Sequence, residues 1–291
     1  MTDRESAQDV SPGDETQLVA TNVLVMAAVF ACYFFTSYRM GEDARTVGVV
    51  ALLTILVSRG SWSVSAWPWA AVLGSLLVSL WRRPIDVPNH HYMMSYVAAA
   101  LVLCLSAPAP QWGDLMRRNA RWMLIVLMGF ATLQKTVSPT FLDGSYLGYE
   151  IARGGFGDPV LPLFGSVADV TAANDNQVVA FRALPPEDAA YVQLQPATPY
   201  PTLVARGFMV SILAIEVLLF AGFLWLPHSL LPHGLLLSFI VTLGVLRQEF
   251  TFISVVSAMG LMACSGGQLR LRTAYATLAV LCAAAVLKTL N

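Results

Sequence analysis

Apolar residues fall in nine segments along the chain, separated by polar or proline-containing stretches of which all but one are short. The segments cover residues 18–38, 46–58, 64–81, 88–107, 121–137, 204–227, 231–246, 250–265 and 272–290. A membrane-spanning helix needs roughly 20 apolar residues, with a range of about 17–25, so most segments are long enough to cross a bilayer. Segment 46–58 is short for a span and is followed by Arg59-Gly60-Ser61. The pattern therefore predicts an all-α integral membrane protein, a polytopic bundle of eight or nine transmembrane helices.

The one long polar connection covers residues 138–203. A stretch of this length is usually functional or carries its own structure, so we expect an extramembrane element there. Residues 177–184 and 190–195 have the composition of strands, with a proline-containing turn at 185–188, and they predict a small β-hairpin. The run Asn174-Asp175-Asn176 is typical of an Asx-rich turn, which we favour over a cation site.

The domain organisation follows from the same pattern. Residues 1–17 are polar and acidic and lack the basic-then-apolar order of a secretory signal, so we predict a polar N-terminal tail. We also predict that residues 18–291 form a single transmembrane helical domain with the loop 138–203 outside the membrane.

Composition strengthens the membrane prediction. Only 12% of the 291 residues are charged, 56% are hydrophobic, and the mean hydropathy is +0.63. Soluble domains carry about 25% charged residues, so this chain has too few charges to cover a surface that faces water. The partner that this composition demands is the lipid bilayer, and we expect a bacterial inner (cell) membrane. The formal net charge of −1 gives no reason to expect nucleic acid as a partner.

The four cysteines lie inside apolar segments, and no two of them form a CxxC pair. We interpret Cys32, Cys104, Cys264 and Cys282 as buried small hydrophobic residues. No metal site is expected from the sequence, because the adjacent His90 and His91 lack the i, i+4 spacing that places two ligands on one helix face.

Ionisable residues within or beside spans are the first candidates for chemistry, because their burial in lipid is costly unless they are paired. These candidates are His90, His91, Lys135, Glu216, Arg247 and Glu249. Segment 88–107 leaves the membrane face that bears His90, and segment 121–137 returns to it and ends at Lys135. We therefore predict that His90 and Lys135 line one pocket at that face.

Lys135 is the most distinctive of these residues, since it is the only lysine before Lys288 and follows an apolar run. One interpretation is a lysine that snorkels, extending its ammonium from the end of a span to the interface. The other is a general base, made neutral by desolvation, with His90 donating to the anion that forms. Glu216 lies in the middle of its segment, and we predict that it is buried with an arginine or a hydroxyl as partner, or is protonated and bonded to backbone.

Two short motifs around these residues resemble a known family. Asn89-His90-His91-Tyr92 resembles the NHxY motif, and Gln134-Lys135, followed by Pro139, Phe141-Leu142 and Gly144, resembles the K…P-x-(W/F)-L-x-G motif. Both motifs belong to the vitamin K-dependent γ-carboxylase-like proteins, whose membrane part is called the HTTM domain. Glu216 resembles an acidic position in a late span of that family, and the stretch 250–264 is similar to its penultimate span.

The resemblance implies a catalytic chemistry. In these carboxylases the matched lysine deprotonates reduced vitamin K, and the matched histidine stabilises the resulting anion. Oxygen then converts the hydroquinone to a basic intermediate that removes a proton from a glutamate γ-carbon before carbon dioxide adds. Lys135 and His90 would thus be catalytic here, with supporting roles for Asn89, His91, Tyr92, Gln134, Glu216 and Glu249.

The resemblance also has a departure. The sequence ends at Asn291, so we expect a truncated form without the large extramembrane domain that holds the carboxylase's protein substrate. We therefore expect an integral membrane enzyme that deprotonates a quinol-like isoprenoid, with a reduced vitamin K-like quinone as cofactor and a peptide or small molecule as substrate. The competing hypothesis is a non-catalytic membrane module for binding, transport or partner scaffolding that retains the fold.

Overall fold

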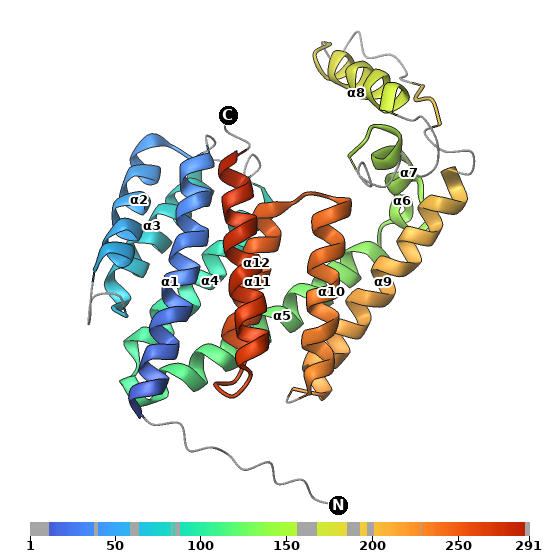
Figure 1. Cartoon of the computed structure of the whole chain (residues 1–291). Helices are drawn as coiled ribbons and strands as arrows, with labels where there is room; N and C mark the ends of the chain where they lie inside the picture. The colour runs from blue at the N-terminus through green and yellow to red at the C-terminus, as the bar shows by residue number, and fades with distance from the viewer. Residues whose placement is uncertain are drawn as a thin grey trace, which may run out of the picture. The chain divides into compact units, whose positions relative to one another are not determined.

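The computed structural model describes residues 12–37, 40–58, 64–82, 84, 88–155, 168–184, 193–196, 201–227 and 229–288. All regular secondary structure in these ranges is helical, with twelve α-helices and one short 3₁₀-helix. The chain divides into two compact units, which Figure 1 shows with their helix labels. Unit 1 comprises residues 1–124 and 250–291, and unit 2 comprises residues 125–249.

Unit 1 is built from the two ends of the chain. Its helices are α1 (Pro12–Thr36), α2 (Glu42–Val57), α3 (Ala66–Arg82), α4 (Asn89–Ser106), η1 (Ala109–Gln111), the first half of α5 (Trp112–Thr136), α11 (Phe250–Ala263) and α12 (Leu269–Lys288). α1 packs against α2, α11 and α12, so the first and last helices lie side by side (Figure 1).

The core of unit 1 follows from the spacing of large residues on α1. Val23, Met26, Phe30 and Phe34 are fully buried. Their spacing of three or four residues places them on one helix face, which the neighbouring helices cover. Phe30 meets the buried Trp69 of α3 edge to face, with ring centroids 5.4 Å apart.

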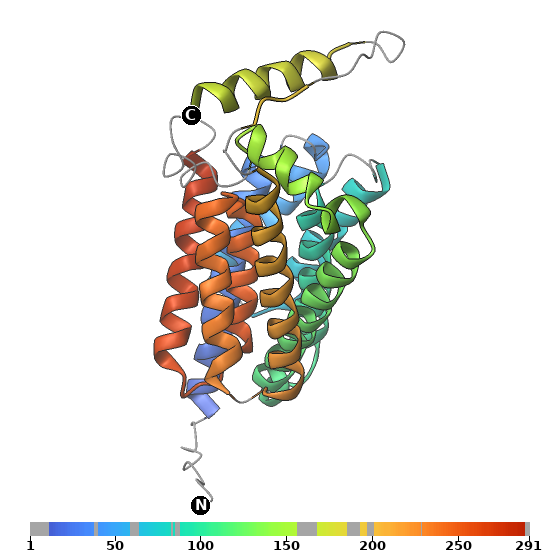
Figure 2. The same ribbon diagram turned by 90° about the vertical axis from the view of Figure 1, so that its right-hand side faces the viewer.

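Among the described residues, unit 2 consists of half of α5 and five further helices. It holds the second half of α5, then α6 (Pro139–Leu142), α7 (Ser145–Ala152), α8 (Ala168–Arg182), α9 (Pro201–Trp225) and α10 (Leu230–Leu246). Phe141, Leu147, Ile151 and Ala205 form a buried cluster that fixes α6 and α7 against the first half of α9. The chain turns between α6 and α7 at Gly144, whose φ of +82° suits glycine. α8 lies beside α7 (Figure 2).

The all-helical prediction is confirmed for the described residues, and each of the nine apolar segments overlaps one helix. Three helical stretches are long and apolar enough to cross a membrane: Glu15–Thr36, Thr202–Trp225 and Leu269–Lys288. These features are compatible with a membrane protein. The total of eight or nine spans, and the single domain covering 18–291, stay predictions.

The predicted β-hairpin is wrong in its first strand. Residues 177–182 belong to α8, while the predicted turn at 185–188 lies outside the described residues and residues 193–195 are irregular. Thr171, Asn174 and Val178 are the buried residues of α8. Their i, i+3, i+7 spacing is that of one helix face, so the longer helical period outweighs the local Val178-Val179 pair that favoured a strand.

The Asn174-Asp175-Asn176 run also differs from its prediction. It lies in the middle of α8, and so forms neither an Asx-rich turn nor a metal loop. Asn174 is fully buried, and its amide donates to the carbonyls of Ala152 and Gln195 and accepts from the Gln195 N–H. These three bonds connect α8 to the end of α7 and to residue 195.

Candidate functional site

The central polar contact of unit 2 joins Lys135 to Glu216. Lys135 Nζ lies 2.7 Å from Glu216 Oε1, in a contact between α5 and α9. A second contact places Gly129 against the ring of Phe220. Since Gly129 precedes Lys135 while Phe220 follows Glu216, the two helices run antiparallel.

Apolar surroundings enclose most of this pair. The side chain of Glu216 is 5% exposed and that of Lys135 is 25% exposed. The ammonium also lies 3.5 Å from the Ala131 carbonyl oxygen and 5.8 Å from the centre of the Phe141 ring. The lysine thus lies between the end of its own helix, an aromatic face and a carboxylate.

One oxygen of Glu216 has no hydrogen-bond partner in the described part of the chain. Oε1 accepts from Lys135, but the buried Oε2 makes no hydrogen bond among the described residues. A buried carboxylate oxygen without a donor is costly, and such an atom is an available position for a proton. The pair can therefore exist as ammonium and carboxylate or, after one proton moves, as amine and carboxylic acid.

The structure tests the prediction for Glu216 directly. Glu216 is buried and has a polar partner, as predicted, but the predicted arginine or hydroxyl is wrong, because the partner is Lys135. Lys135 lies at the end of α5, whereas Glu216 lies well inside α9. The short helices α6 and α7 pack beside the first half of α9, which brings the end of α5 to the level of Glu216. Instead of snorkelling away from the bundle, the lysine ammonium is directed at α9.

The Asn89-His90-His91-Tyr92 motif forms the first turn of α4 in unit 1. His91 is fully buried, with Nδ1 2.7 Å from the Tyr33 hydroxyl and Nε2 3.1 Å from the Leu76 carbonyl oxygen. A carbonyl can only accept, so Nε2 carries the hydrogen and Nδ1 accepts from Tyr33. His91 thereby holds α1, α3 and α4 together.

The other residues of the motif are less enclosed. His90 is half-buried, and its ring lies at 90° to the Tyr33 ring, with ring centroids 5.2 Å apart. Asn89 is exposed, and the exposed Tyr92 donates to the Pro84 carbonyl at 2.6 Å. Of the two histidines, His90 is therefore the more exposed. Since His90 belongs to unit 1 and Lys135 to unit 2, the pocket that they are predicted to share stays a prediction.

A second charged cluster in unit 2 involves Glu249. Arg247 pairs with Glu150 at 2.9 Å and with Glu249 at 2.8 Å, and it also donates to the Gly155 carbonyl. Glu249 is thus a partner of Arg247, at the end of α10. Gln134, the neighbour of Lys135, is exposed.

Two residues that organise these sites have only a weak signal in the sequence. Tyr33 contacts both histidines, and Glu150 is a buried partner of Arg247. Tyr33 does not stand out, because a tyrosine within an apolar segment is common. Glu150 has one signal in the sequence: it is a single acidic residue between Tyr149 and Ile151, within the polar connection 138–203.

Within the described ranges, no group of three or more His, Cys, Asp or Glu residues could hold a metal ion. Comparisons with protein-family models, with curated proteins and with solved structures found no match. The geometry of the Lys135–Glu216 and Tyr33–His91 pairs is therefore the basis for any functional assignment.

Proposed function

We propose that this chain is an integral membrane enzyme of the vitamin K-dependent γ-carboxylase-like type, which removes a proton from a reduced isoprenoid quinone with Lys135. The observation that supports this proposal is the contact between Lys135 and the buried Glu216. We further propose the bacterial inner membrane as its location, with eight or nine spans and a peptide or small molecule as the final substrate.

The donor set fits this ligand. A reduced quinone supplies a weakly acidic hydroxyl on an apolar ring, and Lys135 lies beside the Phe141 ring among apolar residues. Lys135 Nζ accepts the hydroxyl proton, and Glu216 determines whether Nζ has a free lone pair. An ammonium cannot accept a proton, so Nζ must first pass one to Glu216.

The pair can perform this transfer as a relay. One proton moves from Nζ to Glu216, either on Oε1 or on the unpartnered Oε2, and Nζ then takes the hydroxyl proton. At the end of the relay Glu216 is neutral and Lys135 is again an ammonium. The positive charge then lies next to the anion produced, where it is most stabilising. His90 is proposed to donate to the same anion.

The test is oxygen-dependent turnover of a reduced naphthoquinone by the purified protein in lipid nanodiscs, followed by chromatography of the epoxide. Lys135→Met should lower the rate by about 10²–10⁴-fold, the usual effect of removing a general base. Glu216→Gln should also lower it, with a shift of the pH profile. His90→Ala should weaken turnover less than Lys135→Met.

Lys288→Met is the matched control, because it removes the other lysine, which is exposed at the end of α12. It should turn over at the wild-type rate. Wild-type turnover by Lys135→Met would refute the role of the lysine. No turnover by the wild-type protein with reduced benzoquinones or naphthoquinones would refute the enzyme, and would favour the non-catalytic membrane module.

A further inference from the structure

Arg272 is a buried arginine without an acidic partner. It is the fourth residue of α12 and is 6% exposed. Its Nη2 donates to Asn22 Oδ1 of α1 at 2.9 Å, and no carboxylate of the described residues pairs with it. Because an arginine stays protonated inside a protein, its positive charge is permanent. Such a charge is costly to bury when it faces only one neutral acceptor.

Asn22 cannot supply the missing negative charge. Its amide is neutral and buried, and its Nδ2 is directed at Met116 Sδ, 3.6 Å away. The amide therefore offers one oxygen to a guanidinium that has five N–H donors. Nε and Nη1 of Arg272 make no hydrogen bond with a described residue, yet neither atom is fully enclosed. Arg272 thus keeps donors that a group from outside the chain can reach.

A second arginine adds to the positive charge. Arg117 of α5 lies close enough to Arg272 for the two charges to repel each other. Its side chain is 38% exposed and pairs with Asp114 of its own helix. Another nearby acid, Glu15 of α1, lies against Gly113 at the start of α5. Both acids are therefore engaged with α5, and neither pairs with Arg272.

These residues meet at one end of unit 1. α1 and α5 begin at this end, and α11 turns into α12 there (Figures 1 and 2). α12 is one of the helices long and apolar enough to cross a membrane. Arg272 comes three residues after the first residue of α12, about 4.5 Å along the helix axis. In a bilayer this depth is the boundary between the hydrocarbon core and the headgroups.

We propose that Arg272 and Arg117 bind one phosphate group from outside the chain. A guanidinium recognises phosphate through two parallel N–H bonds. Phosphate fits this site because its oxygens can accept from two guanidiniums at once, and its negative charge offsets the repulsion between them. At this depth of a bilayer the available phosphates are those of lipid headgroups, and basic pockets between membrane helices bind such headgroups. A soluble phosphate compound carries the same group.

The site is separate from the Lys135–Glu216 pair. It lies in unit 1, whereas that pair belongs to unit 2. It depends on the proposed membrane location but not on the proposed enzyme activity. In the sequence, Arg270 and Arg272 look equivalent at the start of an apolar segment. Only the tertiary structure distinguishes them, because Arg270 is exposed and Arg272 is buried.

The test is thermal unfolding of the delipidated protein in dodecyl maltoside during a titration with phosphatidylglycerol. A ligand that binds the folded state raises the Tm once its concentration exceeds the Kd. The wild-type protein should show a saturable rise. Arg272→Gln should weaken binding by about tenfold or more, since one charge-assisted hydrogen bond contributes roughly that factor. Arg272→Lys, which keeps the charge, should retain part of the affinity.

Arg270→Gln is the matched control, because it removes the same charge from an exposed position in the same turn of α12. Its lipid affinity should equal that of the wild type. Without lipid, Arg272→Gln should be at least as stable as the wild type, because it removes an uncompensated charge. Arg117→Gln, at a half-buried position, should also weaken binding, and it tests the proposal if Arg272→Gln fails to fold.

Sodium phosphate and glycerol 3-phosphate, added in place of the lipid, identify the source of the phosphate group. A rise in Tm with the lipid alone assigns the site to a headgroup. An equal rise with a soluble phosphate, lost in Arg272→Gln, assigns it to a free phosphate compound. The proposal is overturned if none of the three raises the Tm, or if Arg272→Gln and Arg117→Gln respond like the wild type. It is also overturned if Arg272→Gln is destabilised equally with and without lipid, which would show a purely structural arginine.

Discussion

At the scale of single residues, two polar pairs lie within apolar helices and differ in what they can do. In Lys135–Glu216, one carboxylate oxygen makes no hydrogen bond within the described part of the chain, which leaves a position for a proton. In Tyr33–His91 both ring nitrogens of the histidine are engaged, so the pair is fixed. The first pair has the features of a chemical site, and the second has those of a structural connection.

The Tyr33–His91 contact gives a prediction about stability. Tyr33→Phe removes the hydroxyl and leaves a fully buried Nδ1 without a donor, which should lower the free energy of unfolding by about 1–3 kcal/mol. Thermal unfolding in detergent measures the effect. Tyr92→Phe is the matched control, because this exposed tyrosine loses one surface bond, and its change should stay within about 0.5 kcal/mol. Equal stability of the two variants would contradict the structural role of His91.

At the scale of helices, close packing depends on two glycines in unit 1. A Cβ on Gly48 would lie 1.9 Å from the ring of Phe34, and a Cβ on Gly260 would lie 2.5 Å from that of Tyr275. The first contact brings α1 and α2 together, and the second does the same for α11 and α12. Helix backbones in membranes commonly approach each other at such small residues.

Gly260→Ala should therefore separate α11 from α12. Overpacking of this kind typically costs about 1–3 kcal/mol, and Tyr275 is fully buried, with no open side to move into. Gly74→Ala is the matched control in α3, where a Cβ would meet nothing within 4 Å. That change should stabilise the helix by up to about 1 kcal/mol, because alanine is the better helix former. In thermal unfolding, the Tm should fall for Gly260→Ala and rise for Gly74→Ala.

The attachment of α8 to α7 depends on Asn174. Asn174→Ala leaves two carbonyls and one N–H without their partner, and we expect α8 to open more often. Hydrogen exchange across residues 168–182 should accelerate about tenfold or more, since a loss of about 1.4 kcal/mol corresponds to that factor. Asn176→Ala, at an exposed position of the same helix, should leave exchange unchanged. Equal exchange in the two variants would show that Asn174 is not the attachment point.

At the scale of the whole molecule, α9 provides the best test of membrane topology. Asn174 brings Gln195 to the end of α7, and α7 packs against the start of α9. Leu226 directly follows the other end of α9, whose 25 residues span about 37 Å at 1.5 Å per residue. This length is sufficient to cross a bilayer.

We therefore predict that cysteines at positions 195 and 226 react from opposite sides of the membrane. In a background without the four native cysteines, Gln195→Cys and Leu226→Cys should be labelled by an impermeant maleimide from different faces of sealed vesicles. Asn176→Cys should behave like Gln195→Cys, because α8 lies beside residue 195. Labelling of positions 195 and 226 from the same side would refute α9 as a membrane span.

The sequence by itself determined the helical class and the positions of the long helices. Each apolar segment overlaps one helix because burial in lipid or in a bundle requires continuous apolar faces and internally satisfied backbone groups. The sequence also marked Lys135 and Glu216, since ionisable residues in apolar segments are rare and costly. It failed for α8, where a local pair of β-branched residues was given more weight than the longer helical period.

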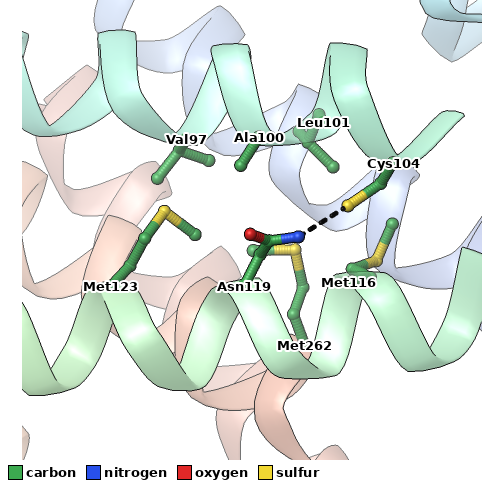
Figure 3. Close-up of a pocket in the computed structure, with 8 residues that line it drawn as sticks. All are labelled: Val97, Ala100, Leu101, Cys104, Met116, Asn119, Met123 and Met262. Carbon is green, nitrogen blue, oxygen red and sulfur yellow. Dashed lines mark hydrogen bonds between the residues drawn. The ribbon is translucent and has the colours of Figure 1, made fainter. Parts of the chain in front are cut away.

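Only the tertiary structure decided which polar residues are partners. Lys135 and Glu216 are 81 positions apart, and Tyr33 and His91 are 58 apart. The periodicity of a helix determines which face of it is apolar, but the neighbour that covers that face depends on how all the helices pack. A buried charge or thiol takes its chemistry from that neighbour, which here is a carboxylate for Lys135 and the amide of Asn119 for Cys104 (Figure 3).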